Sequence, residues 1–258
     1  MKSEKKKKEL SKRKAMSLKY SIITVCLNSE KTIRQTIESV ISQSYDNWEH
    51  IIVDGASNDS TVEIIKEYNS KYPEKIKYIS EKDKGIYDAM NKGIKMATGD
   101  LIGILNSDDY YDSFAIESIN DTVTTTKRTV YYGEEKYYEN EKEVYCSILH
   151  HQFLDKYMIW HEAAFVSKDI YEDFGLYNVE YKSAADYEYF LKLFLSKDVT
   201  FVPVYKLIVN FRGGGMSSSY HSLMEEFEIK RKYNLISTKE YFSKKLFNQL
   251  KYKAGKIK

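Results

Sequence analysis

The stretch SIITVCLNSEKTIRQTIESVISQSYDNWEHIIVDG, residues 21–55, places an amphipathic segment between two short apolar runs. The runs Ser21–Leu27 and Glu49–Val53 are rich in β-branched residues and have the length of buried strands. Between them, Glu30–Gln43 carries its apolar residues at the spacing of one helical face. Units in which a helix joins two apolar strands build parallel sheets that are covered by helices. The stretch therefore predicts the start of an α/β fold.

The alternation of strand and helix continues beyond this stretch and then changes character. Up to residue 127, strands are expected at Lys75–Ser80 and Leu101–Leu105, and helices at Thr61–Tyr72, Gly85–Ala97 and Ser113–Thr124. From residue 128, strands are expected at Thr129–Tyr138, Glu143–Leu149 and Val199–Val204, and helices at Ala184–Ser196, Ser219–Tyr233 and Tyr241–Tyr252. We therefore expect one α/β domain over residues 20–217, with a mostly parallel central sheet flanked by helices. Its halves are 20–127 and 128–217, and C-terminal helices follow in 218–258.

The net charge of +2 is unevenly distributed over the 258 residues. Residues 1–19 form a basic tail with a charge of +7, and residues 239–258 carry +6, which leaves an acidic body. A nucleic-acid-binding protein usually places its basic surface on the folded domain, so the distribution argues against that class. The basic ends either touch an anionic lipid surface or are solvated termini.

The cysteines and the apolar segments indicate in which cellular compartment the protein is expected. Cys26 and Cys146 cannot form a disulfide framework, and the Lys-rich start is not followed by a signal-peptide core. No stretch approaches the ~18 apolar residues of a membrane-spanning helix. We expect a reducing, cytoplasmic environment, with the inner face of the membrane as a site of peripheral association.

Polar and acidic residues follow each of the first four predicted strands. They are Asn28, Asp54, Glu81 with Asp83, and the run Ser107-Asp108-Asp109. Ligands of open parallel sheets bind beyond the carboxyl ends of the strands, so we expect these side chains to share one site. A divalent cation such as Mg²⁺ or Mn²⁺ relieves the repulsion between gathered carboxylates and also binds phosphate oxygens. The chain has neither the G-x-G-x-x-G nor the G-x-x-x-x-G-K-[ST] loop, so the pattern predicts a metal-assisted site for a nucleoside diphosphate.

Three motifs carry a resemblance to a known family. They are IIVDGASNDST (Ile51–Thr61), SEKDKGIYDAMNKGI (Ser80–Ile94) and LNSDD (Leu105–Asp109). In this order, and each at a predicted strand end, they resemble motifs of the inverting family 2 glycosyltransferases. The resemblance covers about residues 20–217. It implies the GT-A fold and transfer of a sugar from a nucleotide-diphospho-sugar, specifically a UDP-sugar, to an acceptor hydroxyl.

The resemblance also implies which residues surround the nucleoside. They are Thr24, Cys26, Asn28, Asp54, Asp83 and Asp108. Asp54 resembles the aspartate that reads the uracil edge, since a carboxylate can accept the ring N–H. Asp108 resembles the residue that contacts the ribose.

Asp109 resembles the metal ligand of the D-x-D element, which would hold Mn²⁺ or Mg²⁺. Two positions depart from the family pattern. Leu27 stands where members often have a tyrosine, so a stacking contact to the base is either absent or supplied elsewhere. Asn106 stands where an aspartate is common, which leaves the metal more dependent on Asp109.

An inverting transfer needs a carboxylate that removes the proton of the acceptor hydroxyl. The family places this group at the start of a helix in the second half, where the chain has SAADYE, residues 183–188. Asp186 and Glu188 would point to different helix faces, so only one of them can be the base. Asp186 resembles the family's aspartate and is the predicted base. The alternative is that it forms a capping box with Ser183.

Two further features have both a functional and a structural interpretation. Phe211–Ser217, with the sequence FRGGGMS, either orders over the diphosphate through Arg212 and the backbone around Gly214, or is a plain loop. His161 resembles a family position near the acceptor or the diphosphate; the alternative is a structural histidine. The other histidines show no zinc-ligand spacing.

Two other functions compete with sugar transfer. A sugar-nucleotide nucleotidyltransferase needs a Gly-rich basic loop after its first strand, and Leu27–Glu30 is not such a loop. A non-catalytic nucleotide-sugar-binding module would keep Asp54 but would not need both Asp109 and Asp186. For a transferase, the resemblance implies a carbohydrate or lipid-linked acceptor in bacterial surface polysaccharide or lipid-linked oligosaccharide synthesis. The basic, amphipathic C-terminal helix agrees with a lipid-anchored acceptor.

Overall fold

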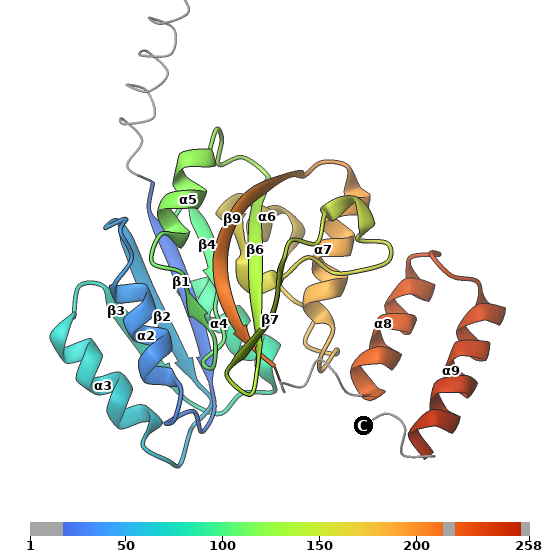
Figure 1. The fold of residues 1–258 in the computed structure, drawn as a ribbon, viewed down its shortest axis with the longest axis horizontal. Helices are drawn as coiled ribbons and strands as arrows, with labels where there is room; N and C mark the ends of the chain where they lie inside the picture. The colour runs from blue at the N-terminus through green and yellow to red at the C-terminus, as the bar shows by residue number, and fades with distance from the viewer. Residues whose placement is uncertain (1–17, 214–219, 254–258) are drawn as a thin grey trace, which may run out of the picture.

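The computed structural model describes residues 18–213 and 220–253. Within these ranges one sheet runs through the molecule, with the strand order β3-β2-β1-β4-β8-β6-β9-β5 and with β7 paired to β6. Helices cover both faces of this sheet, and the last two helices form a hairpin at one side of it (Figure 1). This arrangement places the carboxyl ends of the first four strands at one edge.

The strands are β1 (Tyr20–Cys26), β2 (Trp48–Asp54), β3 (Ile76–Ser80), β4 (Leu101–Ile104), β5 (Tyr110–Tyr111), β6 (Thr129–Glu139), β7 (Lys142–Ser147), β8 (Ala164–Ser167) and β9 (Thr200–Arg212). The helices are α2 (Ile33–Ile41), α3 (Thr61–Lys71), α4 (Ile86–Met96), α5 (Ala115–Thr122), α6 (Lys168–Phe174), α7 (Ala185–Ser196), α8 (Tyr220–Lys232) and α9 (Thr238–Lys253). Short 3₁₀ turns lie at His151–Phe153 and His161–Ala163.

The first four strands in the order are parallel, as the alternation of strand and helix predicts. β1 pairs with β2 on one side and with β4 on the other, and β2 pairs with β3. Every residue of β1, β2 and β4 is buried, because helices cover both faces of this part of the sheet. β8 then runs antiparallel to β4, while β6 and β9 are parallel to each other. The expected α/β fold is confirmed, and the second half of its sheet is mixed.

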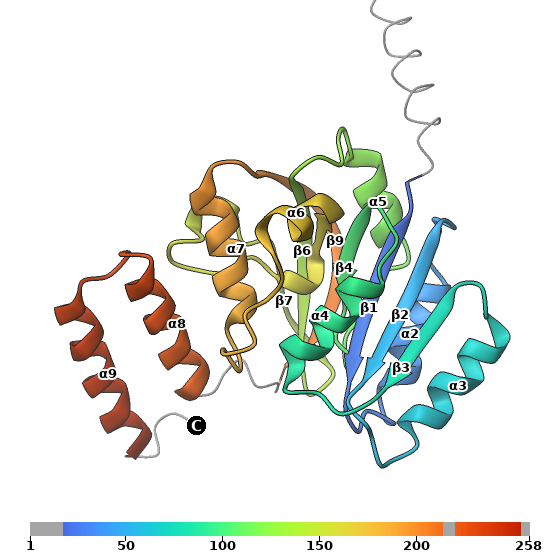
Figure 2. The same cartoon turned by 180° about the vertical axis from the view of Figure 1, so that it is seen from behind.

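Two apolar layers hold the helices on the sheet. On one face, α4, α6 and α7 pack against strand residues such as Ile23 and Val53. On the other face, α2, α3 and α5 cover residues such as Ile22 and Ile52. Figure 2 shows α4 and α6 in front of the sheet, and Figure 1 shows α2 in front of it. Neighbouring residues of one strand serve opposite layers, because successive side chains of a strand point to opposite faces.

Three features differ from the expectations. Leu18 is buried and the Lys19 ammonium pairs with Glu49 at 3.1 Å, so the basic tail ends before residue 18. β9 continues to Arg212 instead of ending at Val204, because its later half pairs with both β6 and β5. The helix α6 and the two-residue strand β5 were not expected, since segments this short carry no clear periodicity.

Glu49 is a buried carboxylate that ties β2 to β1 and to the turn before β4. It accepts hydrogen bonds from the hydroxyl of Ser21 and from the backbone N–H and hydroxyl of Thr98, each at 2.7 Å. It also pairs with the ammonium groups of Lys19 and Lys77. Burial alone would raise the pKa of Glu49, but these donors outweigh burial and lower the pKa to about 2.

We expect Glu49→Gln to lower the free energy of unfolding at neutral pH by about 1–3 kcal/mol, because buried donors lose a charged acceptor. The ionised carboxylate stabilises the native state above its unfolded pKa of 4.5, and this contribution is lost as the pH falls toward 2. Wild type should therefore lose stability over this window more steeply than the variant. Urea unfolding at about pH 7 and pH 3 measures both effects. The exposed Glu63→Gln is the matched control, and equal losses in both variants would contradict this assignment.

Candidate active site

A cavity of about 890 Å³ opens at the carboxyl ends of the parallel strands. Its walls come from the loops after β1 and β4, the start of α4, the turn His161–Ala163, the start of α7 and the end of β9. The carboxylates that line it are Glu30, Asp59, Asp83, Asp108, Glu162 and Asp186, and the permanent cations are Lys31, Lys182 and Arg212. The volume lies in the usual range for pockets that bind small organic ligands. The excess of acidic groups favours a ligand that brings a cation with it.

The loop after β1 forms one wall of the cavity. Cys26 and Asn28 line it, as predicted, and so does Leu27, whose side chain is 60% exposed. Asp83 faces the same space from the segment before α4. A Cβ on Gly55 would lie 3.1 Å from Asp83 Oδ2 and 3.5 Å from Leu27 Cδ1. The missing side chain of Gly55 thus leaves room between an apolar group and a carboxylate.

Thr24 and Asp54 are fully buried and do not line the cavity. The Thr24 hydroxyl lies 2.9 Å from Nε2 of His50 inside the sheet, so the predicted nucleoside contact of Thr24 does not fit its position. The Asp54 carboxylate accepts hydrogen bonds from the backbone N–H and hydroxyl of Ser57 and from the hydroxyl of Ser80. Asp54 therefore shapes the loop after β2, and it does not face the cavity in this arrangement.

The two aspartates after β4 have different environments. Asp108 lines the cavity, whereas Asp109 is fully buried. One Asp109 oxygen accepts the backbone N–H of Arg212 at 2.8 Å, and the other has no hydrogen-bond partner among the described residues. Burial, with the nearby charges of Glu162 and Asp108, raises the pKa of Asp109 well above its usual value. The predicted role of Asp109 as metal ligand does not fit this position, and Asp108 is the carboxylate that reaches the cavity.

Arg212 supplies the predicted cation on this side of the cavity. Its guanidinium donates to the backbone carbonyl of Asp108 and to the side chain of Gln35. It also lies 5.1 Å from the centre of the Tyr110 ring. Arg212 reaches Asp108 and Tyr110 because β9 continues to Arg212 and pairs with β5. Gly214, the other contact predicted in this segment, lies outside the described residues.

The oxygen donors of the cavity decide which cation it can hold. Among the residues that the structure describes, no three His, Cys, Asp or Glu side chains gather as a metal site. Asp108 and Asn106 border the cavity, and the side-chain oxygen of Asn106 has no hydrogen-bond partner within residues 18–213 and 220–253. A Mg²⁺ ion held by one or two protein oxygens completes its shell with water and phosphate oxygens. The donor set therefore fits a divalent cation that is shared with a bound diphosphate.

Asp186 borders the cavity from the first turn of α7. Its Oδ1 accepts hydrogen bonds from the hydroxyl of Tyr87 at 2.8 Å and from the N–H of Tyr187 at 2.9 Å. Its Oδ2 lies 3.2 Å from Nδ1 of His161. Burial raises the pKa of Tyr87 well above its usual value, so this phenol keeps its proton and donates it. The carboxylate is therefore held in one orientation at the cavity wall.

Asp186 forms no capping box with Ser183, and Glu188 does not reach the cavity. Ser183 donates its hydroxyl to Glu225 of α8, and α7 has no side-chain bond at its N-cap. Glu188 does not line the cavity and accepts the hydroxyl of Tyr233 at 2.6 Å. Asp186 is thus the carboxylate of this segment that reaches the cavity.

Glu162 is a functional candidate that the sequence patterns did not single out. It is buried, its Oε1 accepts the side-chain N–H of Asn106 at 2.8 Å, and its Oε2 lies 3.0 Å from Nδ1 of His161. Burial raises the pKa of Glu162 to about 8 and lowers that of His161. A continuous chain of contacts therefore runs from Asn106 through Glu162 and His161 to Asp186. The only sequence signal was an acidic residue beside a lone histidine in an apolar run.

Comparisons with known proteins bear on the family and the fold of the chain. The profile of the family described as Glycosyl transferase family 2 matches residues 21–183. A PGL/p-HBAD biosynthesis glycosyltransferase of Mycobacterium bovis (strain BCG / Pasteur 1173P2) is 25% identical over 214 residues, which cover 78% of this chain and 79% of the relative.

Two solved structures share the fold. S. aureus TarS 1–349 in complex with UDP has a TM-score of 0.64 at 20% identity, and the match covers 83% of this chain and 64% of that chain. The mannosyltransferase PcManGT from Pyrobaculum calidifontis, in complex with GDP-Man and Mn²⁺, has a TM-score of 0.63 at 14% identity. That match covers 91% of this chain and 69% of the other.

The family profile spans the ends of β1, β2, β3 and β4 and stops just before Asp186 and the end of β9. It accounts for well over half of the 258 residues. This match favours sugar transfer over the nucleotidyltransferase and the non-catalytic binding module. The chain belongs to glycosyl transferase family 2 and has the GT-A fold of the glycosyltransferases that it resembles in structure.

Proposed function

We propose that the protein is a metal-dependent, inverting glycosyltransferase that moves a sugar from a UDP-sugar to an acceptor hydroxyl. The observation that carries the proposal is that Asp108 and Asp186, from different halves of the chain, border the same cavity. In this proposal Asp108 faces a cation and a diphosphate, and Asp186 acts as the base. The acceptor is a carbohydrate or lipid-linked saccharide of bacterial surface polysaccharide or lipid-linked oligosaccharide synthesis, which the motif resemblance supports.

The space beside Gly55 suits the uracil ring. The exposed side chain of Leu27 offers an apolar contact to one face of the base, in the place where the family often has a tyrosine. Asp83 Oδ2 can accept the N–H of the ring, and the ammonium of Lys92, 2.5 Å from Asp83 Oδ1, fixes that carboxylate. The UDP in the TarS structure supports a uridine donor.

The transfer needs one proton acceptor and one leaving-group stabiliser. As the acceptor oxygen forms its bond to the anomeric carbon, its proton passes to Asp186, and UDP leaves with the electron pair of the broken carbon–oxygen bond. Attack from the side opposite the diphosphate inverts the anomeric configuration. A divalent cation beside Asp108, when bound, supplies positive charge for the departing diphosphate. Tyr87 and His161 keep the Asp186 carboxylate oriented toward the cavity.

We expect Asp186→Asn to lower kcat by about 10²–10⁴-fold, because the amide cannot accept the proton. The affinity for UDP should change by less than about threefold, since the proposed contacts to the nucleobase come from Leu27 and Asp83 and not from Asp186. UDP release from UDP-sugars, with water as acceptor, and calorimetric titration with UDP measure the two quantities. The exposed Asp198→Asn is the control. Undiminished UDP release by the Asp186 variant would overturn its role as the base.

Asp108 and Asp109 should respond differently to substitution. We expect Asp108→Asn to weaken UDP binding in the presence of Mn²⁺ by about tenfold, with little change without the metal. Asp109→Ala should instead lower the free energy of unfolding by about 1–3 kcal/mol, because the Arg212 N–H loses its buried acceptor. Calorimetry with and without Mn²⁺, together with urea unfolding, separates the outcomes. If Asp109→Asn removed the Mn²⁺ effect while Asp108→Asn kept it, the order of these roles would be reversed.

Glu162 is a positioning residue, since it acts on Asp186 through His161. Because burial raises its pKa to about 8, the side chain is mostly protonated near neutral pH. The neutral form can orient both Asn106 and His161 without adding a negative charge next to Asp186.

We expect Glu162→Gln to remove a pH dependence of wild type. Between the unfolded pKa of 4.5 and the folded pKa of about 8, the native state binds more protons, so stability falls as the pH rises through this window. The glutamine variant should show a smaller fall, and its transfer rate should not decline when the pH passes about 8. Urea unfolding at about pH 5 and pH 8 and a pH–rate profile measure these effects. Exposed Glu139→Gln is the control, and identical profiles for wild type and Glu162→Gln would contradict the assignment.

A further inference from the structure

The last helix presents an apolar stripe to solvent. Four large apolar side chains of α9 are 57–60% exposed, namely Phe242, Leu246, Phe247 and Leu250. The buried residue of this helix is Tyr241, at 4% exposure, and its hydroxyl donates to Glu228 of α8. Single exposed apolar residues are common, but four on one helix face form a patch that marks a contact surface.

The stripe faces away from α8. With 3.6 residues per turn, Leu250 lies two and a half turns after Tyr241 and therefore on the opposite side of the helix. Figure 1 and Figure 2 show α9 as the outermost element on this side, with α8 between it and the rest of the molecule. No helix in the described ranges is long and apolar enough to cross a membrane. α9 thus presents an apolar stripe on the side opposite the face that packs on α8, as helices that lie on a surface do.

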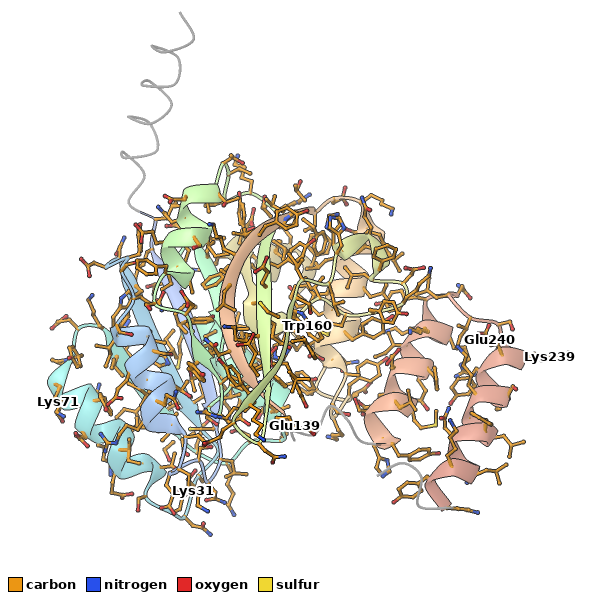
Figure 3. All side chains as sticks on the ribbon, viewed as in Figure 1. Lys31, Lys71, Glu139, Trp160, Lys239 and Glu240 are labelled. Carbon is orange, nitrogen blue, oxygen red and sulfur yellow. The ribbon has the colours of Figure 1, made fainter. Side chains whose placement is uncertain are left out.

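Positive charge accompanies the stripe. α9 carries one acidic residue, Glu240, and five basic ones, Lys239, Lys244, Lys245, Lys251 and Lys253. By the same helical geometry, Lys239 and Lys253 lie on the side of the stripe, one at each end of the helix. Figure 3 shows Lys239 at the outer edge of the molecule. Apolar side chains flanked by ammonium groups match a surface that is anionic outside and apolar beneath.

We propose that α9 docks on an anionic lipid surface. The apolar stripe enters the boundary between headgroups and acyl chains, and the lysines contact headgroup phosphates. The positive charge of α9 favours a lipid surface over a second copy of the chain as the partner. Two copies that met through α9 would bring together two positively charged faces, which repel each other.

α8 connects the docking helix to the cavity. Glu225 of α8 accepts the backbone N–H groups of Lys182 and Ser183, and both of these residues line the cavity. Docking through α9 would therefore hold the cavity near the surface that carries a lipid-linked acceptor. That consequence rests on the proposed function, whereas the docking itself does not.

The first test measures binding to vesicles of phosphatidylcholine with and without phosphatidylglycerol. We expect wild type to bind the anionic vesicles at least about tenfold more tightly, with each lysine at the surface worth about fivefold. The stripe variant replaces Phe242, Leu246, Phe247 and Leu250 by Ser and should lose at least about tenfold in affinity. The control variant replaces Phe114, Tyr157 and Tyr205 by Ser; these side chains are 59–64% exposed elsewhere, and their loss should leave binding within about twofold.

A second readout reports on α9 itself, because the basic residues before Leu18 also attract anionic lipid. In a Cys146→Ser background, an environment-sensitive fluorophore on Leu246→Cys should shift to shorter wavelength on anionic vesicles, and one on Tyr205→Cys should not. The proposal would be overturned if the fluorophore at position 246 showed no shift, or if the stripe variant bound vesicles as tightly as wild type. It would also be overturned if wild type formed a dimer in solution and the stripe variant did not. Calorimetry with UDP should give the same affinity for wild type and stripe variant, so a failure of docking stays distinct from a failure of the proposed function.

Discussion

The antiparallel pairing of β4 with β8 is the contact on which the site depends. Because these strands run in opposite directions, the residues that follow β4 lie beside those that precede β8. Asn106 thereby meets Glu162, and the two halves of the chain contribute to one cavity. The approach requires Gly103, since a Cβ at this position would lie 2.9 Å from the ring of Phe165 and 2.7 Å from the hydroxyl of Tyr111. A residue without a side chain in the sheet therefore sets the spacing of groups at the site.

Several acidic groups near the cavity are buried, and burial favours their protonated forms. Burial raises the pKa of Glu135 to about 9 and that of Glu162 to about 8, and it raises the pKa of Asp109 well above its usual value. Protonated forms of these buried groups repel one another less than three carboxylates would. The fold can therefore hold several buried acidic side chains close to Asp108 and Asp186.

The position of the site could be predicted from the sequence, but the direction of several side chains could not. The polar residues after the first four strands predicted the place of the cavity, because the carboxyl ends of parallel strands lie at one edge of the sheet. Asp108 and Asp109 are adjacent, however, and lie in a turn between β4 and β5, so no periodic pattern tells which one faces the ligand. The burial of Asp54 depends on hydroxyl groups of its own loop and of β3. Glu162 gains its partners from tertiary contacts alone.

The C-terminal hairpin belongs to the construction of the site, although it follows the residues that match the family profile. α7 begins at Ala185 without a side-chain cap, so its start is held by contacts of the residues before it. Glu225 of α8 accepts the backbone N–H groups of Lys182 and Ser183, the two residues before the N-cap Ala184, at 2.7 and 2.8 Å. A carboxylate near the start of a helix is also favoured by the helix dipole. Because these contacts fix the segment that leads into Asp186, the position of the proposed base depends on α8.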